Sequence, residues 1–244
     1  MISCFETVEL RDGLYFELDA HLSLLRTALA TLGLPPLDEP QLSRALELAR
    51  SHPPEPEGVD SLRRVRVSWD DRGEPIVVAS PMLVHTTPAA VFVDPEPRLL
   101  STASWAGLKT TSYRSATAYS SEHPASDEVL MVNELRSICG GGYSNLFTVV
   151  RGSLITPRVG SGSRAGVTRS LIIEGLRDAG VEVFEGTLSV DDVLNADEAF
   201  LTSTGRHVQA IGSINGNDYP PERPVTELAA RTFDQIYNES FRWS

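Results

Sequence analysis

Hydrophobic and polar residues alternate at the start of the chain, as they do in a strand that is buried on one face. Residues 2–9 and 14–18 show this alternation, and Arg11-Asp12-Gly13 between them is typical of a tight turn, so we expect a hairpin. Apolar residues then recur at steps of three and four, which predicts a helix with Asp19 as its cap and Gly33 after its end. The apolar face of this helix consists of Leu22, Leu25, Leu29 and Leu32.

The same patterns continue as far as residue 100. A second helix is expected over residues 39–50, and a proline-rich connector follows it over residues 51–60. Short β-branched and apolar stretches then predict strands over 64–69, 75–79 and 91–93. Residues 1–100 therefore form a small α+β domain in this interpretation, and the Ser-, Thr-, Ala- and Gly-rich residues 101–107 form an interdomain linker.

The remainder of the chain, residues 108–244, is expected to be a larger α/β domain. Its predicted helices run from Gly166 to Gly180, over a short stretch capped by Ser189, and from Thr226 towards Trp243. Its predicted strands are 128–132, 145–150, 153–156, 181–184, 198–203 and 207–211. The fold class is thus α/β (α+β), with two domains.

Composition narrows the class of protein. Of 244 residues, 41% are hydrophobic and 22% are charged, as in ordinary globular proteins. The 33 acidic and 21 basic residues give a net charge of −12, which repels a nucleic acid. No apolar run is long enough for a membrane span, and no signal peptide is recognised, so we expect a cytoplasmic protein. Two cysteines, Cys4 and Cys139, are expected as reduced thiols, and the scattered histidines predict no metal site.

One basic residue stands apart from the others. The chain contains 20 arginines but a single lysine, Lys109, which follows the expected linker. An amine can lose its proton and attack a carbonyl to form an imine, whereas a guanidinium stays protonated. Lys109 is therefore a candidate nucleophile at a domain boundary, where ligand sites commonly form, although the count alone also fits a chance survivor of a coding bias.

Two segments of the second domain are suited to binding an anion. Gly166-Val167-Thr168 opens a helix, so free N–H groups, the helix dipole and a hydroxyl converge there. Thr202-Ser203-Thr204-Gly205 places hydroxyls at the end of a strand. Ordinary capping and turn chemistry also explains both segments. Ser161-Gly162-Ser163 lacks the strand-to-helix setting of a serine-hydrolase nucleophile.

Taken together, the ordered motifs resemble one family. They are similar in order and spacing to the class IV, fold-type IV pyridoxal-phosphate enzymes, which include branched-chain and D-amino-acid aminotransferases and aminodeoxychorismate lyase. The resemblance covers nearly the whole chain, and it implies two domains with the cofactor in a cleft between them. The motifs are Phe5-Glu6-Thr7, His21-Leu22, Lys109-Thr110-Thr111-Ser112-Tyr113, Ser144-Asn145-Leu146-Phe147, Gly166-Val167-Thr168-Arg169 and residues 196–204.

The resemblance also implies roles for individual residues. Lys109 would form the Schiff base with pyridoxal 5'-phosphate, and Tyr113 would approach the phenolic oxygen of the cofactor ring. The phosphate would be held by four residues in two segments, which are Val167, Thr168, Ser203 and Thr204.

Three features depart from the family's pattern. The family's Glu at the pyridine nitrogen is replaced here by Gly140, and its phosphate-binding Arg on the first helix is replaced by Leu24. Arg26 would project about 200° away from the required direction. The Phe5-Glu6-Thr7 motif lies at the start of the chain, so one wall of the family's cleft is expected to be absent. Slower transamination and weaker cofactor binding follow from the two substitutions.

Two hypotheses about function result. The first is a cytoplasmic, homodimeric pyridoxal-phosphate enzyme that acts on an amino acid or an amino-substituted carboxylic acid, either as an aminotransferase or as a 4-amino-4-deoxychorismate-lyase-like enzyme. The second is a non-catalytic relative that binds another small molecule in the former cofactor cleft. Gly140 and Leu24 motivate the second hypothesis.

Overall fold

The computed structural model describes residues 3–51, 62–93, 95–111 and 122–241, which fall into two compact units. Unit 1 comprises Met1–Val84, Leu108–Ser112 and Tyr237–Ser244, and unit 2 comprises His85–Gly107 and Tyr113–Ile236. Most of the predicted connector at 51–60 lies outside the described residues. None of the helices in these four stretches is both long and apolar enough to cross a membrane.

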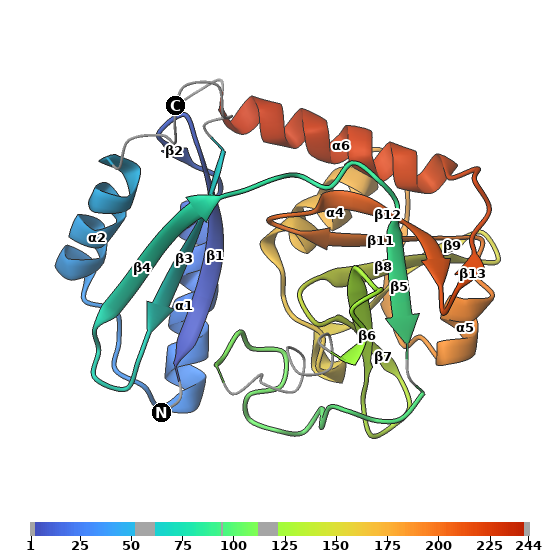
Figure 1. The fold of residues 1–244 in the computed structure, drawn as a ribbon, viewed down its shortest axis with the longest axis horizontal. Helices are drawn as coiled ribbons and strands as arrows, with labels where there is room; N and C mark the ends of the chain where they lie inside the picture. The colour runs from blue at the N-terminus through green and yellow to red at the C-terminus, as the bar shows by residue number, and fades with distance from the viewer. Residues whose placement is uncertain (1–2, 52–61, 94, 112–121, 242–244) are drawn as a thin grey trace. The chain divides into compact units, whose positions relative to one another are not determined.

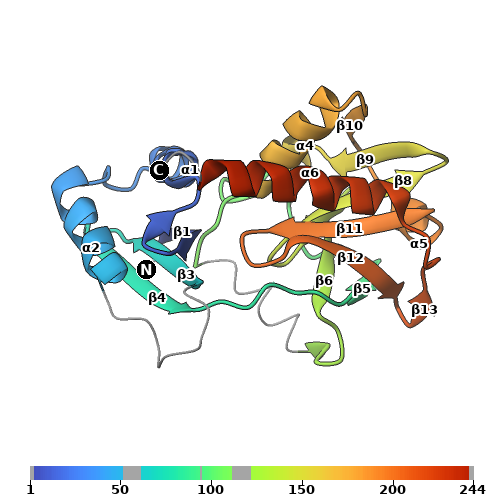
Figure 2. The same ribbon diagram turned by 90° about the horizontal axis from the view of Figure 1, so that it is seen from above.

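Unit 1 is an antiparallel sheet with two helices on one face (Figures 1 and 2). The strand order is β2-β1-β3-β4, and the strands are β1 (Cys4–Arg11), β2 (Leu14–Tyr15), β3 (Arg63–Trp69) and β4 (Pro75–Pro81). The helices are α1 (Leu18–Leu32) and α2 (Glu39–Ser51). Leucines of both helices pack on the inward side chains of β3, which are Val65, Val67 and Trp69. The inward-facing residues of the strands and the apolar faces of the helices therefore pack into one core.

The start of α1 differs from the sequence prediction. Glu17 adopts a left-handed conformation with φ 51°, which ends the hairpin and starts the helix at Leu18. Asp19 lies inside the first turn and is not the cap, and the second strand stops at Tyr15 instead of continuing to Leu18. The helix ends at Gly33 as predicted, with φ 63°.

Unit 2 is built on a strongly mixed sheet. In the described residues nine strands pair, in the order β10-β9-β8-β11-β12-β5-β6-β7, with β13 beside β12. The strands are β5 (Ala89–Val93), β6 (Glu128–Val132), β7 (Ile138–Gly141), β8 (Asn145–Val150), β9 (Ser153–Pro157), β10 (Val183–Gly186), β11 (Glu198–Ser203), β12 (His207–Ile214) and β13 (Asn217–Asp218). The helices of this unit are α4 (Val167–Asp178), α5 (Val190–Leu194) and most of α6 (Pro224–Ser240), with a 3-10 turn over Val159–Ser161. Helix α4 packs against β11.

The division of the chain into units differs from the expected boundary at residues 101–107. Strand β5 pairs in parallel with β6 and with β12, so the chain enters unit 2 at His85. Leu108–Ser112 then belongs to unit 1. Parallel pairing of strands distant in sequence leaves no local pattern, and composition alone therefore placed the expected boundary too late.

Candidate functional site

Lys109 is held by its backbone against the first strand of unit 1. Its carbonyl accepts a hydrogen bond from the N–H of Phe5 at 2.9 Å, and Thr110 forms a β-bridge with Cys4. The N–H of Thr111 donates to the carbonyl of Ser3 at 2.9 Å. These contacts fix the carbonyl of Lys109 and the two residues that follow it, so the sheet holds the backbone from which the side chain extends.

The amine of Lys109 is bound to a buried carboxylate. Its Nζ lies 2.8 Å from Oε2 of Glu6, and Nδ1 of His21 lies 3.0 Å from the same oxygen. Glu6 and His21 are 5% and 3% exposed, whereas the Lys109 side chain is 21% exposed. Burial opposes ionisation of Glu6, but the charge of Lys109 and the hydrogen bond from His21 outweigh it and hold the pKa of Glu6 below its ordinary value.

In unit 2, the start of α4 has no side-chain cap from its N-cap residue. Gly166 precedes the helix and has no side chain to cap it, and the first intrahelical bond runs from Ser170 to the Gly166 carbonyl. The N–H groups of Val167 and Thr168 therefore have no acceptor within the helix. Both residues are buried. This arrangement can hold an anion, as the sequence predicts.

The hydroxyl-bearing end of β11 lies next to this helix start. A Cβ on Gly166 would stand 2.2 Å from Oδ1 of Asn145, and Asn145 pairs with Thr202 across β8 and β11. The Oγ1 of Thr202 is buried and has no hydrogen-bond partner among the described residues. Ser203 and Thr204 follow directly, and both are partly exposed. The two predicted anion-binding segments are thus neighbours.

Strand β7 carries Gly140, which adopts φ 124°, a conformation that disfavours any side chain. Glu128 lies beside this turn, against Gly141. Its carboxylate accepts hydrogen bonds from Val129 N at 3.1 Å, Tyr143 N at 3.3 Å and Ser144 Oγ at 2.7 Å, lies 3.7 Å from Nη2 of Arg206, and is fully buried. Glu128 therefore serves the turn and has no free oxygen to offer a ligand.

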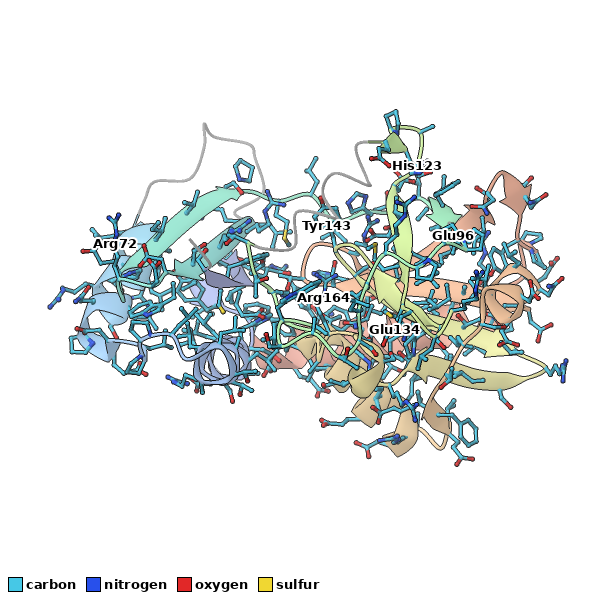
Figure 3. The ribbon with its side chains drawn as sticks, turned by 90° about the horizontal axis from the view of Figure 1, so that it is seen from below. Arg72, Glu96, His123, Glu134, Tyr143 and Arg164 are labelled. Carbon is cyan, nitrogen blue, oxygen red and sulfur yellow. The ribbon has the colours of Figure 1, made fainter. Side chains whose placement is uncertain are left out.

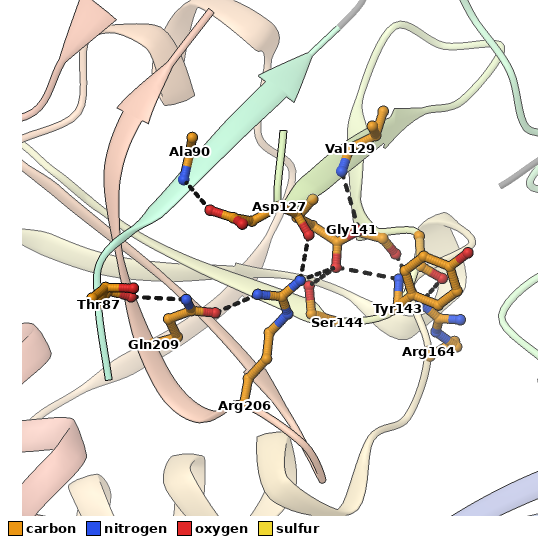
Figure 4. A network of polar contacts seen from close by, with 12 residues as sticks. Thr87, Ala90, Asp127, Val129, Gly141, Tyr143, Ser144, Arg164, Arg206 and Gln209 are labelled. Atoms are coloured by element: carbon orange, nitrogen blue, oxygen red, sulfur yellow. Dashed lines mark hydrogen bonds and ion pairs between the residues drawn. The ribbon is translucent and has the colours of Figure 1, made fainter. Parts of the chain in front are cut away.

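Polar contacts rigidify the loop that follows Gly140 (Figure 4). Arg164 donates to the carbonyls of Gly141 and Gly142 at 2.8 and 2.7 Å, and it lies near Tyr143 in Figures 3 and 4. Further along the network, Arg206 donates to the Asp127 carbonyl at 2.5 Å and to Gln209. The loop is held by these contacts without a carboxylate at position 140.

The family's Arg position on α1 is also unfilled. Leu24 is partly buried there, three residues after His21 and on the same side of the helix. Arg26 points elsewhere, because it pairs with Glu39 of α2 at 2.7 Å. The sequence-based prediction that Arg26 would project away from the direction of position 24 is thus consistent with the structure.

Neither cysteine is a candidate nucleophile. Both are free and buried, and burial raises the pKa of Cys4 to about 11 and that of Cys139 to about 12. Both thiols therefore stay protonated at neutral pH.

The residues predicted from the sequence fall into both units. Lys109 lies in unit 1, whereas Val167, Thr168, Ser203 and Thr204 lie in unit 2, and Tyr113 lies outside the described residues. Within unit 1, the partly exposed amine of Lys109 is suited to an aldehyde. Within unit 2, the N–H groups at the start of α4 and the buried Thr202 hydroxyl, which has no partner among the described residues, are suited to a phosphate, whereas Gly140 offers no carboxylate to a ring nitrogen. The contacts among Glu6, His21 and Lys109 were not predicted from the sequence. The one available signal was the position of Glu6 on an alternating strand, where it faces inward.

The chain belongs to the family described as "Amino-transferase class IV", whose sequence profile matches residues 3–214. A relative from Thermotoga maritima, named "Probable branched-chain-amino-acid aminotransferase", is 28% identical over 195 residues, which are 76% of this chain and 71% of the relative. The branched-chain-amino-acid aminotransferase of Salmonella typhimurium is 33% identical over 102 residues, or 41% of this chain and 33% of that protein.

Solved structures show the same fold. The branched-chain aminotransferase of Thermoproteus uzoniensis matches with a TM-score of 0.84 at 23% identity. The match covers 99% of this chain and 87% of the aminotransferase chain. A hypothetical aminotransferase of Mycobacterium tuberculosis in its PLP-bound form has a TM-score of 0.81 at 22% identity, and the match covers 95% of this chain and 87% of the other chain. A Legionella pneumophila protein named "Putative 4-amino-4-deoxychorismate lyase" has a TM-score of 0.83 at 19% identity, and the match covers 98% of this chain and 91% of the other chain. The predicted fold-type IV architecture is confirmed.

Proposed function

We propose that the protein is a pyridoxal-phosphate-dependent enzyme that acts on an amino acid or an amino-substituted carboxylic acid. One observation carries the proposal. The single lysine of the chain is fixed by its backbone to β1, and its amine lies at a buried carboxylate while its side chain remains 21% exposed. Transamination and aminodeoxychorismate cleavage are both included, since the family contains both activities.

Each predicted site residue has a proposed task. Lys109 attaches the cofactor through a Schiff base and afterwards moves protons at the reacting carbon. The N–H groups of Val167 and Thr168, with the hydroxyls of Ser203 and Thr204, hold the phosphate. Tyr113 is proposed to contact the phenolic oxygen of the ring.

Bound pyridoxal phosphate supplies an electron sink for the negative charge that develops on the substrate carbon. The chain's own contribution is placement and charge. The N–H groups and the dipole at the start of α4 would stabilise the negative charge of the phosphate, and the amine of Lys109 contacts Glu6. Since Gly140 offers no carboxylate to the ring nitrogen, we expect slow turnover compared with family members that have one.

A second candidate function is a non-catalytic protein that retains the fold and binds a different small molecule. Gly140 and Leu24 favour it, because they remove the ring-nitrogen carboxylate and a phosphate-binding Arg. The Glu128 carboxylate accepts hydrogen bonds from three protein groups, so it does not replace the missing carboxylate at the ring nitrogen.

The two candidates are separated by incubating the purified protein with pyridoxal phosphate and then reducing it with borohydride. The enzyme hypothesis expects a visible absorption band that disappears on reduction and a mass increase located on Lys109 by peptide mapping. A panel of L- and D-amino acids and aminodeoxychorismate then identifies the reaction. A protein that remains colourless and unlabelled in excess cofactor would support the non-catalytic candidate.

A further inference from the structure

The carboxylate of Glu6 is the structural neighbour of the Lys109 amine. One oxygen, Oε2, receives both the Nζ of Lys109 at 2.8 Å and the Nδ1 of His21 at 3.0 Å. Glu6 lies on β1, His21 lies on α1, and Lys109 lies on the segment paired with the start of β1. Three elements of unit 1 thus converge on a single oxygen.

A carboxylate in this position needs its partners. Glu6 shares its face of β1 with Cys4, Val8 and Leu10, all of them buried, so its charge lies beside an apolar core. An unpaired buried charge is strongly unfavourable, whereas a paired and hydrogen-bonded one is tolerated. Lys109 supplies the opposite charge to Glu6, and His21 supplies a second hydrogen bond.

We propose that Glu6 is a positioning residue for Lys109: its carboxylate holds the amine as an oriented ammonium ion, and His21 fixes the carboxylate in place. The part of this inference that concerns cofactor attachment rests on the proposed function. The contact between Glu6 and Lys109 is independent of the proposed function, since it is present in the protein without a ligand.

The arrangement has a chemical consequence for attachment. Condensation of the amine with an aldehyde forms a C=N bond and releases one water, and it requires the neutral amine. Lys109 must therefore first give up a proton, and its ion pair with Oε2 of Glu6 at 2.8 Å opposes this loss. Glu6 thus restrains the amine before attachment, and the proton passes to solvent when the partly exposed amine reacts.

The test uses the reactivity of the single lysine. Trinitrobenzenesulfonate reacts with neutral amines, and peptide mapping separates Lys109 from the chain's amino terminus. At one fixed pH near neutrality, we expect Glu6→Gln to be labelled at Lys109 about tenfold faster than the parent, because loss of an adjacent negative charge favours the neutral amine. Glu9→Gln is the matched control. Glu9 is a buried carboxylate on the same strand that accepts a hydrogen bond from Tyr237, and the substitution changes net charge equally.

Equal labelling rates in Glu6→Gln and the parent would overturn the inference, as would equal acceleration by Glu9→Gln. A second measurement covers the case in which Glu6→Gln does not fold. Carboxyl ¹³C resonances report the titration of Glu6, and in Lys109→Met we expect the pKa of Glu6 to rise, since burial then acts without the lysine charge. A role in packing alone would leave the Glu6 titration unchanged by this substitution.

The same variants separate this inference from the proposed function. Pyridoxal phosphate with borohydride tests whether Lys109 attaches the cofactor at all. A parent protein that takes up no cofactor, but whose Lys109 is labelled faster in Glu6→Gln, contradicts the proposed function and supports the inference. Normal cofactor attachment, with no effect of Glu6→Gln on the labelling of Lys109, would support the proposed function and contradict the inference.

Discussion

A side-chain carbon on Gly166 would lie 2.2 Å from Oδ1 of Asn145, so the first residue before α4 is in contact with the first residue of β8. Gly166 has φ −71°, which any residue can adopt, and the glycine is therefore required by the close approach and not by its backbone conformation. The Asn145 amide is itself fixed, since Nδ2 donates to the Arg164 carbonyl at 2.8 Å. This contact sets the distance between the helix start and the sheet.

Gly166→Ala is therefore expected to destabilise the fold by about 1–3 kcal/mol, the usual range for overpacking a closely packed site. Gly160→Ala is the matched control, because a Cβ there meets nothing within 4 Å and no positive φ is involved. Urea denaturation of both variants measures the difference. Equal stabilities would show that Asn145 moves aside without cost.

Thr168→Val tests the start of α4 as a phosphate site. Loss of a hydroxyl that donates to a charged oxygen is expected to weaken binding of inorganic phosphate about tenfold. Amide chemical shifts of Val167 and its neighbours during a phosphate titration provide the measurement. Thr148→Val is the control, since this hydroxyl on β8 is buried and has no hydrogen-bond partner in the part of the chain that the structure describes. If phosphate does not change the chemical shifts of the α4 amides in the parent protein, the proposed phosphate site is contradicted.

Much of the fold could be predicted from local pattern. The helical stripe of α1, the hairpin of β8 and β9 and the helix cap at Ser189 are local features, and the structure contains all three. Strand β7 was not predicted, because Ile138-Cys139-Gly140-Gly141 has neither alternation nor β-branched residues beyond the first. It becomes a strand through its partner β6, which is a tertiary effect.

The candidate site was predictable only in part, for similar reasons. Lys109 stands out by residue count, and the start of α4 stands out by its glycine. The contact between Glu6 and Lys109 joins residues 103 positions apart, and no spacing in the sequence indicates it. The constraint on Gly140 is likewise tertiary: with φ 124° and the Ser144 carbonyl 3.1 Å from an added Cβ, a Glu cannot be restored there without strain.

Lys109→Arg is expected to abolish cofactor attachment while the protein remains folded. Arginine keeps the positive charge beside Glu6, so the melting temperature should change little, but a guanidinium provides no neutral amine. The visible spectrum with pyridoxal phosphate, the mass after borohydride reduction and a thermal melt provide the readouts. Persistence of the parent's band and mass increase would place the attachment site elsewhere.

The pH dependence of stability should carry the signature of Glu6. Because its pKa in the folded protein is lowered, the ionised form contributes stability fully above the ordinary carboxyl pKa, and this contribution is lost as the pH falls through the folded value. The difference in unfolding free energy between the parent and Glu6→Gln should thus be constant near neutrality and shrink in acid. A difference independent of pH over the whole acid range would contradict the assignment.

Leu24→Arg should tighten the binding of pyridoxal phosphate by restoring the family's phosphate-binding arginine on α1. Position 24 lies on the same side of the helix as His21 and is partly exposed, so an arginine there can extend without leaving a buried charge. One charge-assisted contact to a phosphate is expected to tighten binding by roughly 10- to 150-fold. Ser23→Arg adds the same charge one residue earlier, at an exposed position about 100° around the helix, and is expected to have little effect. Fluorescence titration with the cofactor compares the three proteins. Tightening by both variants would indicate non-specific attraction, and tightening by neither would show that the site now serves another ligand, in favour of the non-catalytic candidate.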